Sequence, residues 1–225
     1  MVERRMPLPR RAILQRGAVL LSAAALGAGG CHRTPVVPTR VIAGGRRREE
    51  LDTQDGVVPI DADDPQQGPA TAVCVLVVFS DFQCPFCREA ALILERLRKE
   101  FPDKTRLVFK HLPIPAHKDA QLAAVAAQVV WLEGGSEAFW RYHDLCFDHP
   151  HELSSKNLLA WAAEVGVQPA SIEKRAPEAQ LRVEEDLALA SRLEIGGTPR
   201  QYVNRRRVQG AYPYEQMRAW VDEEV

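Results

Sequence analysis

Residues 79–87 read Phe-Ser-Asp-Phe-Gln-Cys-Pro-Phe-Cys, and this stretch decides the fold because it joins a strand pattern to a helix pattern. The run Val73–Phe79 before it is almost wholly β-branched and apolar, which predicts a strand covered on both faces. Between residues 90 and 101 apolar side chains recur every three or four positions, which predicts an amphipathic helix. Thr105–Leu112 supplies a second strand. The order strand, helix, strand favours a parallel pair.

Two cysteines stand at the junction of this strand and helix. If Cys84 is the N-cap, Pro85 occupies the first helical position, where its missing N–H costs nothing. Cys87 then lies one turn on, within reach of a disulfide. Free N–H groups and the helix dipole favour a thiolate on Cys84. We therefore predict a redox pair in which Cys84 is the nucleophile and Cys87 the resolving thiol, with Pro85 and Phe86 between them.

Two other interpretations of the pair stay open. A static disulfide is possible, but a bridge across two residues saves little chain entropy. The pair could also supply half of a zinc site, but neither a second Cys-x-x-Cys nor a His-x-x-x-His is present, so the remaining ligands would come from scattered histidines. Cys74 and Cys146 lie in apolar segments and are expected in the core, although a disulfide between them is conceivable.

The rest of the chain predicts more helix and a closing hairpin. From about residue 115 to about residue 194 the apolar pattern is mostly helical. Strand character returns at 201–204 and 207–209, and a short helix is expected at 214–221. The expected fold class is α/β with a helical insertion.

These residues carry a family resemblance. The stretch 79–87, together with Gly-Gly-Thr-Pro at 196–199, resembles the DsbA-like branch of the thioredoxin superfamily over roughly residues 59–225. The resemblance implies a thioredoxin fold, with the helical insertion between its strand-helix-strand half and its closing β-hairpin and helix. It also implies thiol–disulfide exchange with extracytoplasmic proteins. Thr198 and Pro199 would form a cis peptide beside the cysteines and bind the substrate backbone.

Three positions bear on the chemistry. Val78 stands where many relatives carry a buried acid that shuttles the proton of the resolving cysteine. Phe86 replaces the histidine of the most oxidising members, which should raise the thiol pKa and weaken the oxidising drive. Thr198 is closer to the isomerase-type members. Together they leave the direction of electron flow open, with oxidase or isomerase slightly favoured over reductase.

The first 48 residues differ in net charge from the rest of the chain. The chain has 225 residues and a net charge of -1, yet residues 1–48 hold ten Arg and one Glu, or +9, so the remainder sums to -10. Arg10 and Arg11, followed by a short apolar run, resemble a twin-arginine export signal. The run ends in Ala-Gly-Gly before Cys31, which resembles a bacterial lipobox with Cys31 as the lipidated residue; an ordinary cleaved signal with an incidental cysteine is the alternative.

The expected organisation is a signal peptide over 1–31, a flexible linker over 32–56 and a thioredoxin-like domain over 57–225, with 57–60 as a short edge strand and the insertion at about 115–194. With 46% hydrophobic residues the chain is not disordered as a whole, and no apolar run is long enough for an internal transmembrane helix. The near-zero net charge argues against a dedicated nucleic-acid binder.

The sequence thus predicts an exported thiol–disulfide oxidoreductase, tethered to the membrane by a lipid on Cys31. It needs no cofactor or metal, because the Cys84–Cys87 disulfide is itself the redox group. Its partners would be secreted or envelope proteins with thiols or disulfides, a redox partner that resets the pair, and the membrane through the anchor, but no nucleic acid. The alternative is a non-catalytic thioredoxin-fold protein: a peptide-binding chaperone or a copper carrier.

Overall fold

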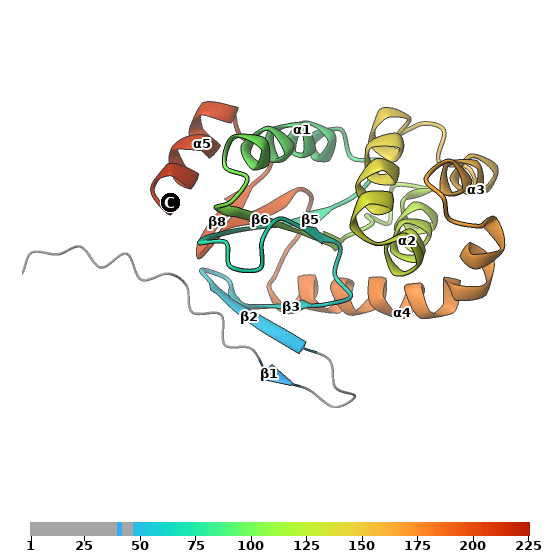
Figure 1. Ribbon diagram of the computed structural model, residues 1–225, viewed down its shortest axis with the longest axis horizontal. Coiled ribbons are helices and arrows are strands. Elements are labelled where there is room, and N and C mark those ends of the chain that lie inside the picture. Colours follow the sequence, from blue (N-terminus) through green and yellow to red (C-terminus); the bar gives the residue numbers. More distant parts are fainter. Residues whose placement is uncertain (1–39, 42–46) are drawn as a thin grey trace, which may run out of the picture. The chain divides into compact units, whose positions relative to one another are not determined.

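The computed structural model describes residues 40–41 and 47–225 (Figure 1). The expected signal peptide, Cys31 and most of the expected linker lie outside these residues. Within the described ranges, no helix combines the length and apolar character that a membrane crossing requires.

A five-stranded sheet forms the centre of the fold, in the order β4-β6-β5-β7-β8. Strands β5 and β6 are parallel, with Cys74 opposite Thr105 and Ser80 opposite His111, and the other pairs are antiparallel. All seven residues of β5 are buried, which confirms the strand covered on both faces. The bounds are β4 Gln66–Gln67, β5 Cys74–Ser80, β6 Thr105–His111, β7 Arg200–Val203 and β8 Arg206–Gln209.

Two hydrophobic cores cover the two faces of this sheet. On one face, Leu76 and Val78 of β5 pack with helices α1 (Pro85–Glu100) and α5 (Tyr214–Asp222). On the other, Val77 and Phe79 pack with the end of α4 and with the strands that precede the sheet (Figure 1). The alternation along β5 follows from the two-residue period of a strand.

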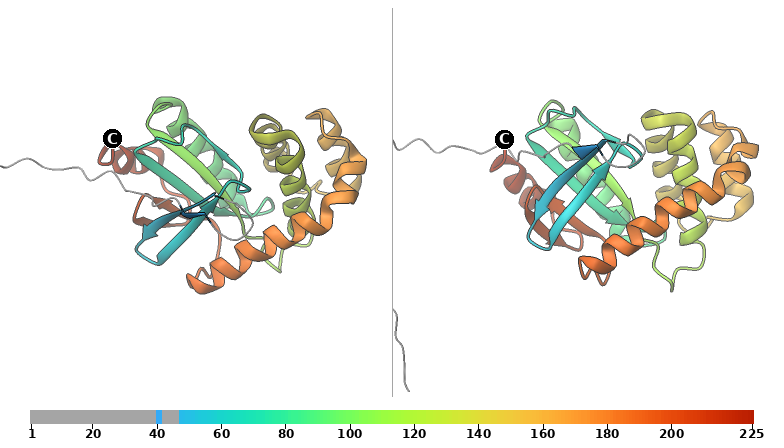
Figure 2. Two further views of the ribbon diagram at one scale, coloured as in Figure 1. Left: turned by 60° about the horizontal axis from the view of Figure 1, so that its bottom comes forward. Right: turned by 90° about the horizontal axis from the view of Figure 1, so that it is seen from below.

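The helical insertion lies between β6 and β7, as expected. It comprises α2 (Ala120–Asp148), α3 (Ser155–Glu164) and α4 (Pro169–Arg192), and it stands beside the sheet in both views of Figure 2. Helix α2 is kinked at Gly135, whose φ of 68° and ψ of -159° are essentially restricted to glycine. Ser154 caps α3, accepting a hydrogen bond from the Asn157 N–H.

The expectation of a flexible linker is wrong for residues 47–56. Strands β1 (Arg40–Val41), β2 (Arg47–Thr53) and β3 (Gly56–Asp61) form a second, antiparallel sheet in the order β1-β2-β3. The expected edge strand at 57–60 is confirmed within β3. In β2, Leu51 and Thr53 are buried while Asp52 between them is exposed, so the strand packs against the domain through one face only.

Candidate active site

Cys84 and Cys87 lie where β5 passes into α1. Cys84 is the N-cap of α1 with an extended backbone (φ -81°, ψ 119°), and Pro85 occupies the first helical position, as predicted. The Cys84 carbonyl accepts hydrogen bonds from the N–H groups of Cys87 (3.0 Å) and Arg88 (3.2 Å), which close the first turn. Both cysteines are free thiols, with exposures of 6% for Cys84 and 1% for Cys87.

The environment of Cys84 favours its thiolate. A hydrogen bond from the Cys87 thiol is the main cause that lowers the pKa of Cys84 to about 5, and hydrogen bonds from Thr198 and from the N–H groups of Cys87 and Phe86 act in the same direction against the effect of burial. These N–H groups belong to the first turn of α1, whose dipole also favours a negative charge at this end of the helix. Cys84 is therefore a nucleophile at neutral pH.

The environment of Cys87 has the opposite effect. Burial raises the pKa of the Cys87 thiol far above its usual range, and its hydrogen bond to Cys84 adds to this. Two donors oppose the rise: the Ser80 side chain, and the Asp81 N–H at 3.4 Å from the sulfur. In the dithiol state the proton of the pair therefore resides on Cys87, and the negative charge on Cys84.

The segment at 196–199 reaches the pair from the far end of the chain. The Thr198–Pro199 peptide is cis, as the resemblance implied, and it leads directly into β7. The Thr198 carbonyl oxygen lies 3.6 Å from the Cys84 sulfur. The structure thus brings Thr198 to the predicted nucleophile across 114 positions of sequence. The role of Thr198 and Pro199 in substrate binding stays a prediction.

The aromatic residues near the pair divide into one exposed and one buried. Phe86 is 58% exposed beside Cys84. Phe82 is buried and stacks on Phe109 with ring centroids 5.5 Å apart. Only the first therefore offers an apolar surface to a substrate.

Sequence reasoning missed a buried carboxylate that holds the active-site loop. Asp81 accepts hydrogen bonds from the N–H groups of Gln83 and Ile114, and His117 Nδ1 lies 2.7 Å from its Oδ2. Gln83 in turn accepts from the Asp119 N–H and donates to the Pro150 carbonyl. No spacing in the sequence links Asp81 to Ile114 and His117, because these contacts span more than thirty positions.

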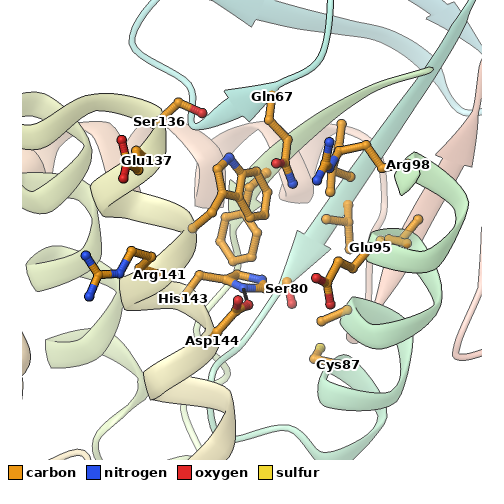
Figure 3. A pocket seen from close by; sticks show the side chains of 16 residues that line it. Gln67, Ser80, Cys87, Glu95, Arg98, Ser136, Glu137, Arg141, His143 and Asp144 are labelled. Carbon is orange, nitrogen blue, oxygen red and sulfur yellow. Dashed lines mark hydrogen bonds and ion pairs between the residues drawn. The ribbon is translucent and has the colours of Figure 1, made fainter. Parts of the chain in front are cut away.

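A cavity of about 280 Å³ opens beside Cys87, between α1 and α2 (Figure 3). Val78 and Ser80 of β5 line it together with Cys87, and charged side chains line it from both helices. They are Glu95 and Arg98 from α1 and Glu137, Arg141, His143 and Asp144 from α2.

The other two described cysteines belong to the core. Cys74 and Cys146 are buried, unbridged thiols, as the core interpretation expected, and the disulfide between them is absent from the structure. Burial raises the pKa of Cys74 to about 12 and that of Cys146 well above its usual value, so both are poor nucleophiles. Across residues 40–41 and 47–225, no three His, Cys, Asp or Glu side chains gather in a group that could hold a metal ion.

Comparisons with known proteins agree with this geometry. The family model described as "Thioredoxin" matches residues 61–223. A relative from Salinispora arenicola named Na(+)/H(+) antiporter NhaA 1 is 34% identical over 184 residues, which is 78% of this chain but 28% of that protein. Disulfide bond formation protein D of Bacillus subtilis is 27% identical over 171 residues, covering 72% of this chain and 77% of the relative.

A solved structure shares the fold. The thiol–disulfide exchange protein alpha-DsbA2 from Wolbachia pipientis superposes with a TM-score of 0.66 at 23% identity, covering 72% of this chain and 87% of the other. The region that the family model matches begins at residue 61, the last residue of β3. The β1-β2-β3 sheet therefore lies almost wholly before the region that this model recognises.

Proposed function

This chain belongs to the thioredoxin family, and from that membership we propose that it is a thiol–disulfide oxidoreductase that exchanges disulfides with secreted or envelope proteins. The observation that carries the proposal is the unequal pair at the beginning of α1, where Cys84 has a pKa of about 5 and Cys87 is buried and protonated. A nucleophilic thiolate with a protonated resolving thiol one turn away is the arrangement that disulfide exchange requires.

In the oxidising direction, a substrate thiolate attacks the Cys84 sulfur of the Cys84–Cys87 disulfide. Cys87 leaves with the electron pair of the broken S–S bond and takes up a proton. A second substrate thiolate then attacks the substrate sulfur of the mixed disulfide, and Cys84 leaves as a thiolate. Two electrons pass from the substrate dithiol to the pair, and the reverse sequence reduces a substrate disulfide.

The low pKa of Cys84 supports oxidation or isomerisation over reduction. A stabilised thiolate lowers the free energy of the dithiol form relative to the disulfide, which makes the pair a stronger oxidant. The Bacillus subtilis relative is also named for disulfide bond formation. The histidine that Phe86 replaces is not needed for a low pKa here, because Cys87, Thr198 and the helix N–H groups supply the hydrogen bonds.

The remaining parts of the proposal rest on the sequence of the head. The twin-arginine pattern and Cys31 support export and a lipid anchor in the membrane. The redox group is the Cys84–Cys87 pair itself, so we propose no dissociable cofactor. A partner that accepts or supplies two electrons must reset the pair after each turnover.

The test is the equilibrium reduction potential of the pair, measured in glutathione or dithiothreitol buffers on protein lacking residues 1–31. We expect a value of about -120 to -180 mV, in the range of disulfide donors and isomerases. A value of about -270 mV would mean that electrons flow from the pair to the substrate, which would make the protein a reductant. A pair that never equilibrates with either buffer would overturn the oxidoreductase assignment.

The exposed Phe86, two residues after Cys84, favours a second candidate, a chaperone that binds unfolded segments without turnover. The variant Cys84→Ser separates the two. If the main proposal holds, Cys84→Ser abolishes the oxidation of a reduced, unfolded client while the wild-type protein oxidises it. If the wild type and Cys84→Ser equally suppress client aggregation and neither changes its thiols, the chaperone is the better account.

A further inference from the structure

The buried resolving cysteine needs a route by which its proton can leave and return. This requirement rests on the exchange chemistry proposed above. Cys87 must lose its proton to attack a mixed disulfide and regain it when the pair is reduced. It is 1% exposed and burial raises its pKa, so its proton does not exchange directly with bulk water. The neighbouring strand residue Val78 is apolar and can neither accept nor donate a proton.

The cavity between α1 and α2 offers a route from Cys87 to water. Cys87 lines it together with Ser80, which also forms a side-chain hydrogen bond with the Cys87 sulfur. A volume of about 280 Å³ accommodates several water molecules. The side-chain nitrogens Trp140 Nε1 and Arg98 Nε are buried with no hydrogen-bond partner among the described residues. Both residues line the same cavity, and water there would satisfy them.

His143 is the imidazole on the opposite wall (Figure 3). Its Nδ1 lies 2.9 Å from Asp144 Oδ1, which leaves Nε2 for a different partner. Phe82, Phe109 and Phe147 surround the ring, with centroids 4.8 to 6.0 Å away, so the ring has a fixed position. An imidazole can both accept and donate a proton near neutral pH.

We propose that this cavity is the proton path of the resolving cysteine, in which the Cys87 proton passes through the Ser80 hydroxyl and cavity water to His143, oriented by Asp144. In the resolving step the Cys87 proton moves along this path to His143 Nε2. The Cys87 sulfur then forms the bond to Cys84 Sγ, and the substrate sulfur leaves with the electron pair of the broken S–S bond. In the reverse step the same path returns the proton to the leaving Cys87 sulfur.

Other charged groups face His143 and could compete for the proton. Glu95 lines the cavity from α1, but its carboxylate is ion-paired with Lys99 at 2.5 Å, and 41% of its side chain is exposed. Glu137 lines the cavity from α2, but its side chain is exposed. Arg98 and Arg141 stay protonated near neutral pH and cannot act as bases. On β6, burial lowers the pKa of His111 to about 3, so that imidazole stays neutral. His143 is therefore the buried side chain on the cavity wall that is best suited to accept the Cys87 proton.

The experiment is rapid-mixing kinetics of the reduced full chain with 5,5′-dithiobis(2-nitrobenzoate), in a Cys31→Ala background that removes the N-terminal thiol. The first phase, proportional to reagent, reports attack by Cys84. The second phase is first order and independent of reagent, and reports resolution by Cys87. At about pH 7 we expect His143→Gln to slow only the second phase, by at least about tenfold. Ser80→Ala should slow it in the same sense.

The pH profile distinguishes a proton path from a packing effect. In His143→Gln the second phase should depend on hydroxide, rising about tenfold per pH unit, whereas the wild-type rate should depend much less steeply on pH because a base inside the cavity takes the proton. Adding Val78→Glu to His143→Gln should restore the rate, because it places a carboxyl group beside Cys87. The matched control is His149→Gln, a half-exposed histidine at the end of α2 that does not line the cavity.

The outcomes separate the two proposals. A second phase that keeps its rate and pH profile in both His143→Gln and Ser80→Ala overturns the proton path while the oxidoreductase assignment stands. Slowing by Glu95→Gln but not by His143→Gln overturns the assignment of His143. If the wild-type protein shows no first phase, the proposed function itself fails. An unchanged first phase in the variants shows that they are folded around Cys84.

Discussion

At the scale of single residues, the two active-site sulfurs differ because one stands before a helix and the other one turn inside it. Cys84 is reached by N–H groups of the first turn, whereas Cys87 lies in the packed side of α1. The spacing Cys-x-x-Cys and Pro85 were enough to predict this difference. The contact from Thr198 was not predictable from the spacing, because it depends on how β7 pairs with β5.

The first prediction concerns the pH dependence of Cys84 reactivity. Because its pKa is lowered to about 5, the thiolate is fully formed above about pH 6 and is lost as the pH falls through 5. The alkylation rate of reduced protein by iodoacetamide should therefore be flat from about pH 6 to about pH 8 and fall about tenfold per unit below 5.

The control for this prediction removes the largest cause of the shift. In Cys87→Ala the hydrogen bond from the Cys87 thiol is lost, so the midpoint of the alkylation profile should move to higher pH. A wild-type midpoint between about pH 8 and about pH 9, the ordinary range of a thiol, would contradict the arrangement of donors described above.

The second prediction concerns Phe86. In Phe86→His an imidazolium would stand beside the Cys84 thiolate and lower the Cys84 pKa further. Each unit of that fall is about 1.4 kcal/mol in favour of the dithiol form, so the reduction potential should rise by about 30 mV per unit. The measurement is the glutathione equilibrium of the variant beside wild type, with Phe86→Leu as the uncharged control. Equal potentials for the two variants would show that the charge at this position is irrelevant.

At the scale of elements, the difference between prediction and structure concentrates in β2. The strands β5 and β6 and the insertion were predictable because long apolar runs and helical periods mark them. Strand β2 reads Arg-Arg-Glu-Glu-Leu-Asp-Thr, so a single apolar residue carries its packing and the charges suggest a linker. Its partner β3 supplies Val58 and Ile60 to the same core. A one-sided strand with one large apolar side chain leaves almost no periodic signal.

The third prediction tests whether β2 belongs to the folded domain. Leu51 is 1% exposed and packs in the core beneath the sheet, so Leu51→Ala should lower the free energy of unfolding by about 2–5 kcal/mol. Urea unfolding followed by circular dichroism measures the loss. The matched control is Leu92→Ala on α1, where the leucine is 60% exposed and the expected change is below about 0.5 kcal/mol. If Leu51→Ala is as stable as Leu92→Ala, β2 is a linker and does not belong to the folded domain.

The sequence pattern also failed to predict the cavity beside Cys87. The helical period predicted α2 as an element, but not that its second half, beyond the kink at Gly135, lines a cavity shared with Cys87. Glycine at 135 is a weak helix breaker in sequence, and the angle between two helical halves depends on packing against α3 and α4. His143 therefore had no functional signal in the sequence beyond its place in an aromatic helix.

At the scale of the whole molecule, a buried group of charges ties the insertion to the sheet on the face opposite the cysteines. Lys110 of β6 is buried with its Nζ 2.7 Å from Asp64 and 3.4 Å from Asp186 of α4. Asp186 also accepts the His111 N–H, and Asp64 accepts the N–H of Asp61. Asp61 is paired in turn with Arg48 of β2 at 2.9 Å. Charges so far apart in sequence gave no pattern that could predict this group.

The fourth prediction follows from the position of Lys110 in this group. Lys110→Met removes the cation that pairs with buried Asp186 and leaves Asp64 with only the more distant Arg182, at 3.8 Å. This should lower the free energy of unfolding by about 3–5 kcal/mol near pH 8. Burial already raises the pKa of Asp186 to about 7 in the wild-type protein, so loss of Lys110 should raise it further.

The pH dependence gives this prediction its sign. A carboxyl whose pKa is higher in the folded than in the unfolded chain contributes stability at low pH and loses it as the pH rises through the folded value. The deficit of Lys110→Met relative to wild type should therefore be large near pH 8 and shrink towards pH 5.

The double variant Lys110→Met/Asp186→Asn should lose less stability than the sum of the losses of the two single variants, because the uncompensated carboxylate is gone. Urea unfolding at both pH values measures all four proteins, with Lys99→Met on the surface as a control expected to lose less than about 1 kcal/mol. A deficit independent of pH and additive with Asp186→Asn would mean that the lysine contributes only its packed methylenes, and that the insertion is held to the sheet by its apolar contacts alone.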